Sequence, residues 1–264
     1  LVVGGGVTGL ECARVAAARG HRVRLVTDAA RPGGMVRVAA EGAGRGRLAA
    51  VADWLEAECR AAGVVIEVRR EVTAADVEAF PGPVVLCIGS VPGRRTYAVD
   101  GGTVVTAADV LAGAELAAGP VVVWDPIGGP IGVSVAELLR GRGADVSLVT
   151  PDLIAGNELS RSGDLAPANV RLLSAGVTIE KRSILRQVLP GTARLEDRFS
   201  GEERTVSAAV VVDAGYRLPD ERLWEATGGH LPRAGDAVAP RSIYEAILEG
   251  RRLGSMVEAG LVPA

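Results

Sequence analysis

The sequence predicts an α/β fold made of two similar units, the second inserted into the first. Three observations support this prediction. Apolar runs of strand length alternate with helical patterns, which is typical of a mostly parallel sheet. Two glycine-rich turns each stand between an apolar run and a helical pattern. A late apolar run and a last helix then complete the first unit.

The first unit begins with the first residue. The apolar run Leu1–Val3 leads into Gly4, Gly6 and Gly9, which have the G-x-G-x-x-G spacing, and a helical pattern of small residues follows. The first glycine allows a tight turn, the second lets a pyrophosphate approach the backbone, and the third allows close packing of helix on strand. The helix N-terminus offers unpaired N–H groups to phosphates. An apolar run over 22–27 closes the βαβ unit, so the turn predicts a dinucleotide site.

Further elements fill the segment before the second glycine-rich turn. Strands and helices continue to alternate there, as expected for a parallel sheet. The pattern predicts a loop over 31–35, an amphipathic helix over 48–62, a strand over 64–68, a short helix capped by Thr73, and a strand over 83–88 that ends in Gly89 and Ser90.

The second unit repeats the first. A constant offset aligns residues 142–150 with 19–27, and the same offset places Gly129 and Gly132 on two glycines of the first turn. Two copies of one mononucleotide-binding unit are stronger evidence for a Rossmann-like fold than either copy alone. The expected elements are a strand over 121–125, a turn over 128–132, a helix over 133–140 and a strand over 144–150.

The remaining elements indicate that the first unit is interrupted. Strands are expected over 177–180 and 193–199, with a hairpin turn at Gly201. The run 210–215 looks like a strand that returns to the first unit, and a helix is expected over 242–256. The first unit is therefore expected at 1–112 and 206–264, and the inserted unit at 113–205.

Composition excludes several classes of function. The chain has 264 residues, a hydrophobic fraction of 48% and a net charge of −3, so it has no electrostatic footprint for nucleic acid. Cys12, Cys59 and Cys87 are far apart and form no C-x-x-C, so no disulfide framework, metal site or iron–sulfur cluster is expected. No apolar run has the length of a membrane span, and a cytoplasmic location fits. Because Leu1 already lies within a strand, we expect further residues upstream.

Four segments together resemble a known family. They are the glycine-rich turn, the Arg31-Pro32-Gly33-Gly34 loop, Cys87-Ile88-Gly89-Ser90, and Gly235-Asp236-Ala237-Val238-Ala239-Pro240-Arg241-Ser242 before the last helix. The chain resembles the two-dinucleotide-domain flavoproteins. Among them it is most similar to the C-terminal FAD/NAD-binding half of the 2,4-dienoyl-CoA reductase and trimethylamine dehydrogenase family, which are old-yellow-enzyme-type NADH:flavin oxidoreductases.

The resemblance implies a flavin-dependent oxidoreductase module. FAD, or ADP alone, would bind at the first turn, where Asp236 would face the ribityl and phosphate region, and NADH would bind at the second turn. Electrons would leave for a barrel domain or subunit with FMN and a 4Fe–4S cluster, outside this chain. Two alternatives remain open: a non-catalytic domain that holds ADP beside a degenerate second site, and a scaffold for docking subunits. A homo-oligomer is compatible with all three.

The sequence departs from the family pattern at both sites. Thr27 stands where an acidic residue normally holds the adenosine ribose, and Asp28 follows on the other side of the strand. Ile127 stands where the first glycine of the second turn is expected, and Pro130 lies within that turn. No arginine cluster follows Thr150, which favours NADH over NADPH.

The expected site residues bind cofactors, since the chemistry belongs to the cofactors themselves. No catalytic acid or base and no metal ligand is expected. The flavin-site residues are Gly4, Gly6, Gly9, Thr27, Asp28, Gly33, Gly34, Gly89, Gly235 and Asp236. The nicotinamide-site residues are Gly128, Gly129, Gly132 and Thr150.

Overall fold

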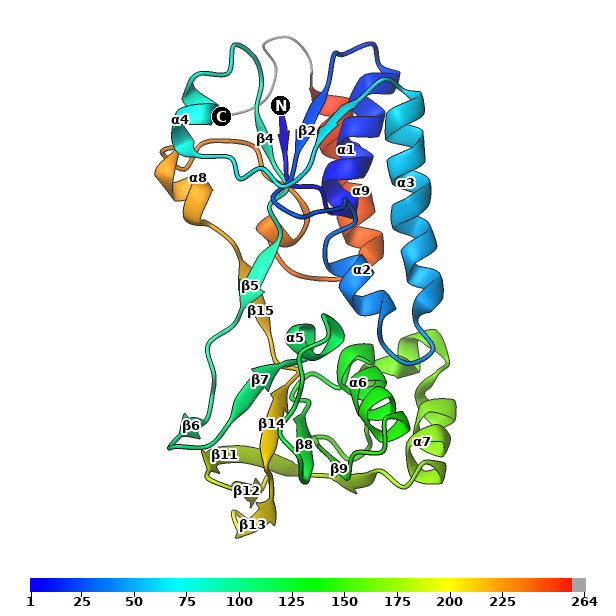
Figure 1. The fold of residues 1–264 in the computed structure, drawn as a ribbon, viewed down its shortest axis with the longest axis vertical. Helices are drawn as coiled ribbons and strands as arrows, with labels where there is room; N and C mark the ends of the chain where they lie inside the picture. Colours follow the sequence, from blue (N-terminus) through cyan, green and yellow to red (C-terminus); the bar gives the residue numbers. More distant parts are fainter. Residues whose placement is uncertain (258–264) are drawn as a thin grey trace. The chain divides into compact units, whose positions relative to one another are not determined.

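The computed structural model describes residues 1–257 and divides them into two compact units (Figure 1). Unit 1 contains Leu1–Arg37, Arg47–Val91 and the residues from Arg217 onward, and unit 2 contains Val38–Gly46 and Pro92–Tyr216. These boundaries differ from the expected 1–112, 113–205 and 206–264. The last seven residues of the expected first unit, 258–264, lie outside the described residues.

Unit 1 is built on a four-stranded sheet of order β3-β2-β1-β4. The strands are parallel, with Val2 opposite Leu25 and Val85, as the alternation of strands and helices predicted. The strands are β1 Val2–Val3, β2 Arg24–Val26, β3 Val65–Glu67 and β4 Val85–Leu86, and the helices include α1 Val7–Ala18, α3 Ala49–Ala61, α4 Ala74–Glu78, α8 Arg222–Ala226 and α9 Ile243–Met256.

Glycines on α9 bring it close to α1. A Cβ at Gly250 would lie 2.3 Å from the carbonyl oxygen of Thr8, and one at Gly254 would lie 2.5 Å from that of Cys12. The two helices therefore touch along their backbones, and Leu10 of α1 is fully buried against the sheet. This packing fixes the start of α1, which carries the first glycine-rich turn.

Unit 2 contains two sheets. The first has the order β10-β9-β8-β14-β7 and is parallel, and the second has the order β13-β12-β11-β6. The strands are β6 Ala98–Val99, β7 Val104–Thr106, β8 Val121–Trp124, β9 Val146–Val149, β10 Thr178–Glu180, β11 Ser183–Leu189, β12 Thr192–Asp197, β13 Glu203–Ser207 and β14 Val210–Asp213. The helices include α5 Ala107–Leu111, α6 Pro130–Gly141 and α7 Leu165–Ser174, and α2 Met35–Ala40 spans the division between the units.

All four residues of β8 are buried because both faces of its sheet are covered. Val121 and Val123 pack in one core with residues of α5, α6 and α7, while Val122 and Trp124 pack in another with Leu185 and other residues of the second sheet. Because both faces are buried, the β8 sequence is continuously apolar, and Asp125 is the first polar residue after it.

Strand pairing explains why the unit boundaries differ from the expected ones. The returning strand β14 pairs with β8 and β7, so it belongs to the sheet of unit 2. The chain passes between the units through β5 Ser90–Pro92 and β15 Arg217–Pro219, which pair with each other. Two- and three-residue strands such as β6 and β7 carry too little periodicity to be found from the sequence.

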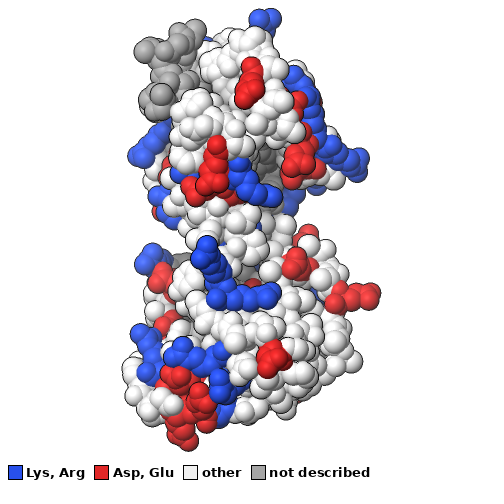
Figure 2. Space-filling model, turned by 90° about the vertical axis from the view of Figure 1, so that its left-hand side faces the viewer, with Lys and Arg blue, Asp and Glu red and all other residues white. Residues whose placement is uncertain are grey.

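Charges of both signs are interspersed among uncharged residues on the face shown in Figure 2. Several arginines form ion pairs with neighbouring carboxylates, such as Arg186 with Glu196 at 2.7 Å and Arg204 with Glu180 at 2.7 Å. Through residue 257, the structure has no helix that is both long and apolar enough to cross a membrane.

Candidate functional site

The first glycine-rich turn joins β1 to α1, and its glycines have different roles. Gly4 has a φ of +107°, and a Cβ there would lie 2.2 Å from the carbonyl oxygen of Cys87. A Cβ at Gly9 would lie 2.0 Å from the carbonyl oxygen of Gly4. Both positions require glycine for packing. A Cβ at Gly6, the N-cap of α1, would meet no atom within 4 Å, so the turn faces open space at the position where a pyrophosphate would approach.

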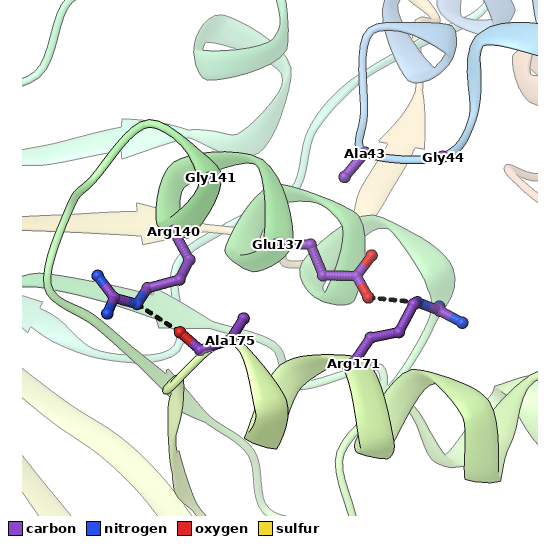
Figure 3. Close-up of a pocket in the computed structure, with 7 residues that line it drawn as sticks. All are labelled: Ala43, Gly44, Glu137, Arg140, Gly141, Arg171 and Ala175. Atoms are coloured by element: carbon purple, nitrogen blue, oxygen red, sulfur yellow. Dashed lines mark hydrogen bonds and ion pairs between the residues drawn. The ribbon is translucent and has the colours of Figure 1, made fainter.

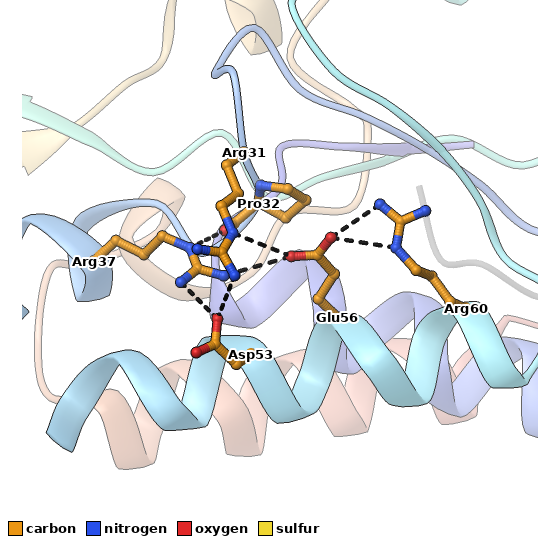
Figure 4. Close-up of polar contacts among 6 residues, drawn as sticks. All are labelled: Arg31, Pro32, Arg37, Asp53, Glu56 and Arg60. Atoms are coloured by element: carbon orange, nitrogen blue, oxygen red, sulfur yellow. Dashed lines mark hydrogen bonds and ion pairs between the residues drawn. The ribbon is translucent and has the colours of Figure 1, made fainter.

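The loop with Gly33 and Gly34 lies against this turn. The Gly33 N–H donates a 2.7 Å hydrogen bond to the Gly5 carbonyl oxygen, and a Cβ at Gly34 would lie 3.0 Å from Gly6 Cα. Arg37 donates to the Pro32 carbonyl oxygen and pairs with Asp53 of α3 at 2.8 Å (Figure 4). The structure thus brings together the turn and the loop that the sequence placed beside the flavin.

Ion pairs to α3 hold the same loop. Arg31 lies 2.7 Å from Asp53, and Glu56 accepts hydrogen bonds from Arg37 and Arg60 (Figure 4). The Arg37 hydrogen bond, opposed by partial desolvation, holds the pKa of Asp53 below its ordinary value. The Asp53 carboxylate therefore stays charged at neutral pH and keeps the loop anchored to α3.

Thr27 and Asp28 directly follow β2, and they differ in exposure. Thr27 is 6% exposed, and a Cβ at Gly5 would lie 2.8 Å from its Cβ. Its hydroxyl accepts a hydrogen bond from the Ala29 N–H at 3.4 Å, whereas Asp28 is exposed. Thr150 in unit 2 is buried in the same way and accepts from the Asp152 N–H at 3.3 Å. The repeat seen in sequence therefore extends to the turn after the second strand.

The Gly235-Asp236 segment reaches the same end of the unit 1 sheet. Gly235 has a φ of +68°, and a Cβ there would lie 2.2 Å from Thr8 Oγ1 of α1. Its N–H donates to Glu249 Oε2 at 2.7 Å. Asp236 is half-buried, and its Oδ2 accepts a hydrogen bond from the Ser90 hydroxyl at 3.2 Å. The segment, the start of α1 and the loop after β4 thus meet in one place.

Sequence reasoning missed two residues of this cluster, Ser90 and Arg217. Arg217 Nε donates to Ser90 Oγ at 2.9 Å, so the Ser90 hydroxyl accepts from Arg217 and donates to Asp236. Gly89 has a φ of +83° and open space at its Cβ position. Ser90 follows Gly89 in the segment Cys87-Ile88-Gly89-Ser90, which the sequence does single out, whereas Arg217 comes close only through the β5–β15 pairing, which has no local signal in the sequence.

The second turn differs from the first in length. Four residues separate Trp124, the end of β8, from Gly129, the N-cap of α6, whereas two residues separate Val3 from Gly6. The strand registers, Val3 opposite Val26 and Trp124 opposite Val149, place Asp125 in the position of Gly4. The expectation that Ile127 replaces the first glycine is therefore wrong. Pro130 is the first residue of α6, where its lack of an N–H and its fixed φ are tolerated.

Asp125 fills the space between β8 and α6. Its side chain is 1% exposed, and Oδ1 accepts hydrogen bonds from the N–H groups of Gly128 at 2.9 Å and Ile127 at 3.2 Å. Oδ2 is buried without a hydrogen-bond partner. A Cβ at Gly132 would lie 2.5 Å from the Asp125 carboxyl carbon, so Gly132 accommodates a carboxylate. Burial, assisted by the charge of Asp152, raises the pKa of Asp125 to about 6, against the opposing effect of the N–H groups of Gly128, Ile127 and Gly129.

A shallow cavity of about 500 Å³ lies elsewhere in unit 2 (Figure 3). Arg140 Nε donates to the Ala175 carbonyl oxygen and Arg171 Nε donates to Glu137, each at 2.7 Å, so these lining cations already have partners. None of the expected cofactor-binding residues lines this cavity. Its lining residues are Ala43, Gly44, Glu137, Arg140, Gly141, Arg171 and Ala175.

The three cysteines are buried. Burial raises the pKa of Cys59 to about 12, and its Sγ contacts the Leu10 carbonyl oxygen at 3.1 Å. Such a thiol stays protonated and unreactive at neutral pH. Within residues 1–257, no group of three or more histidine, cysteine or acidic side chains is arranged to hold a metal ion.

Comparison with known proteins identifies the wider group. Residues 1–40 match the family described as pyridine nucleotide-disulphide oxidoreductase. The N,N-dimethylglycine/sarcosine dehydrogenase of Chromohalobacter salexigens is 30% identical over 96% of this chain and 43% of its own length. The NADH oxidase of Thermoanaerobacter brockii is 32% identical over 95% of this chain and 39% of its own length. The multifunctional alkene reductase/demethylase OYE of Caballeronia cordobensis is 26% identical over 96% of this chain and 43% of its own length. Over almost its whole length, the chain is thus homologous to flavoprotein oxidoreductases of the old-yellow-enzyme type, as the resemblance in its sequence indicated.

The fold agrees with this similarity. The structure of histamine dehydrogenase from Rhizobium sp. 4-9 superimposes with a TM-score of 0.91 at 25% identity, over 98% of this chain and 43% of that one. The chain thus spans about two fifths of the length of these relatives. The chain has the α/β fold of two Rossmann-like units that the sequence predicted.

Proposed function

We propose that unit 1 binds FAD and that the chain passes electrons from NADH, through this flavin, to an FMN and 4Fe–4S barrel outside the described chain. The observation that carries the proposal is the convergence at one sheet end of the open-faced Gly6, the Gly33-Gly34 loop and Asp236. The chain spans about two fifths of its relatives, which leaves room in the whole protein for such a barrel.

The residues present fit a dinucleotide in unit 1. Gly6 and Gly89 both face open space. The N-terminus of the twelve-residue helix α1 provides a positive partial charge beside the open space at Gly6. When bound, FAD supplies the hydride and single-electron chemistry. The chain's own residues would bind and orient it: the turn would receive the pyrophosphate, the Arg37-anchored loop lies beside the turn, and Asp236 would accept hydrogen bonds from ribityl hydroxyls.

The cofactor content of the purified chain tests this proposal. The nucleotide is released by heat, separated by chromatography and identified by mass and by the visible flavin absorption band. We expect one FAD per chain, bleached by NADH under anaerobic conditions. Asp236→Asn should lose FAD, whereas Asp100→Asn, an exposed carboxylate of unit 2, should retain it. Colourless protein that carries ADP would overturn the FAD assignment.

A second candidate is a domain that holds ADP and leaves unit 2 without a nucleotide. Two observations favour it. Thr27 presents a hydroxyl already bonded to Ala29 where a carboxylate would bind the ribose, and Asp125 places a buried acid in the second turn. In this candidate unit 1 contributes structure to a larger oxidoreductase, and electrons do not pass through it. The same release experiment separates the two candidates, because only FAD gives the flavin band.

A further inference from the structure

The second glycine-rich turn has lost much of its capacity to bind phosphate. A phosphate at such a turn is held by backbone N–H groups and by the positive end of the following helix. Here the N–H groups of Ile127 and Gly128 donate to Asp125 Oδ1 at 3.2 and 2.9 Å. Pro130 occupies the first position of α6 and has no N–H to offer.

The Asp125 carboxylate also occupies the space of the motif. In unit 1 the third glycine, Gly9, packs against backbone, with its hypothetical Cβ 2.0 Å from the Gly4 carbonyl oxygen. In unit 2 the equivalent Gly132 packs against the Asp125 carboxyl carbon and Oδ2, each 2.5 Å from its hypothetical Cβ. The negative charge at the N-terminus of α6 is therefore supplied by the chain itself.

A second segment of unit 2 covers the turn. A Cβ at Gly128 would lie 2.8 Å from Asp152 Oδ2 and 3.1 Å from the backbone nitrogen of Asn157. The Glu158 N–H donates to the Gly128 carbonyl oxygen at 2.9 Å. Asp152 adds a second negative charge beside Asp125, and Gly128 and Gly129 are both buried. An incoming pyrophosphate therefore meets two carboxylates here, although a Cβ at Gly129, the counterpart of Gly6, would meet only Ile127 Cγ2 at 3.7 Å.

We propose that Asp125 is an internal anion that takes the phosphate position of the second turn, and that its charge sets the affinity of unit 2 for nicotinamide dinucleotides. The inference rests on the proposed function, since it concerns the unit where NADH is expected, and it predicts that the native chain binds NADH weakly there. Asp125 is thus a specificity-determining residue that selects against phosphates. Gly132 is required beside it because a Cβ at that position would overlap the Asp125 carboxyl group.

The test is a calorimetric titration of NAD⁺, which has the same pyrophosphate as NADH and does not reduce the flavin. Unit 1 is filled beforehand with FAD, or with ADP where the purified chain carries no flavin. The native chain, Asp125→Asn and Asp145→Asn are compared at pH 8. Asp145 is an exposed carboxylate before β9, at the opposite end of the same sheet, so its variant changes the net charge equally.

We expect Asp125→Asn to bind NAD⁺ at least about tenfold more tightly than the native chain, and Asp145→Asn to bind it as the native chain does. Circular dichroism and thermal unfolding verify the fold, and Asp125→Ser replaces the asparagine variant if that one unfolds. Equal affinity of native and Asp125 variants overturns the inference, as does an equal gain in Asp145→Asn. If the native chain binds NAD⁺ tightly, the result supports NADH binding in unit 2. If only the Asp125 variants bind NAD⁺, the result supports the inference about Asp125 and shows that the native chain does not take electrons from NADH through unit 2.

Discussion

Glu11 of α1 and Arg251 of α9 form an ion pair at 2.9 Å although 240 residues separate them in the chain. Glu11 is 1% exposed and also binds Arg14 at 2.8 Å. Burial alone would raise the pKa of Glu11, but the hydrogen bonds and charges of Arg14 and Arg251 outweigh it and hold this pKa below its ordinary value. The pair therefore fastens the last described helix to the helix that carries the first turn.

Glu11→Gln should lower the free energy of unfolding by roughly 2–4 kcal/mol, because a buried ion pair loses its acid. Since the folded-state pKa is depressed, the contribution of Glu11 is present above its unfolded pKa and is lost as pH falls through the folded one. Urea unfolding at neutral and acidic pH measures both effects. The exposed Glu78→Gln serves as control, and a loss of similar size in that variant would contradict the assignment.

Gly250→Ala should destabilise the chain by more than about 2 kcal/mol, because the new methyl group would overlap the Thr8 carbonyl oxygen at 2.3 Å. Gly141→Ala provides the matched control. Gly141 also lies in a helix, but a Cβ there meets nothing within 4 Å. That variant should gain roughly 0.5–1 kcal/mol from helix propensity. Thermal unfolding of both proteins decides the point, and equal melting temperatures would refute the close α1–α9 packing.

Asp125 should make the native chain more stable in mild acid. Its folded-state pKa of about 6 lies above the ordinary value of 3.8, so between these values the folded state holds a proton that the unfolded chain releases. The free energy of unfolding should therefore fall as pH rises through this window, by on the order of 2–3 kcal/mol. Asp125→Asn should lack this decline. Denaturant titrations from pH 4.5 to 7.5 test it, and parallel profiles for the two proteins would show that the carboxyl is not responsible.

Ser90→Ala should weaken FAD binding about five- to tenfold, because it removes the hydroxyl that links Arg217 to Asp236. The protein should still fold, since Ser90 is not part of a core cluster. Reconstitution of the apoprotein with FAD, followed by flavin fluorescence, gives the dissociation constant. Ser255→Ala, on the exposed surface of α9, should retain the native value. An unchanged constant in Ser90→Ala would show that Asp236 does not need this contact.

The fold was predictable because its signals are local and repeated. The run before Gly4, the helix after it and the parallel copy around Gly129 follow from glycine spacing and hydrophobic pattern alone. The unit boundaries could not be predicted in this way, because the sequence of β14 is compatible with either sheet. Its pairing with β8 and β7, which only the structure shows, assigns it to unit 2. The glycines around Pro130 favour a turn there, but proline is equally suited to the first helical position, which it occupies in α6.

The parts of the site that require glycine could be predicted from the sequence. The parts that depend on contacts between side chains distant in sequence could not. The spacing of Gly4 and Gly9 predicts their roles, and in the structure the Cβ position of each lies close to backbone atoms. Arg217 reaches Ser90 only because β5 pairs with β15. Asp125 had one visible signal, an acid directly after a fully apolar strand, but its role depends on the length of the turn that follows.

The pairing of β5 with β15 continues into unit 2, where the Gly93 N–H donates to the Tyr216 carbonyl oxygen at 2.7 Å. The two ends of the long segment 92–216 are therefore neighbours in space. An insertion whose ends already meet can enter a host domain without opening the host's sheet. Residues 92 and 216 are therefore the positions at which engineered exchange of the whole segment would leave the strands of the parent sheet paired.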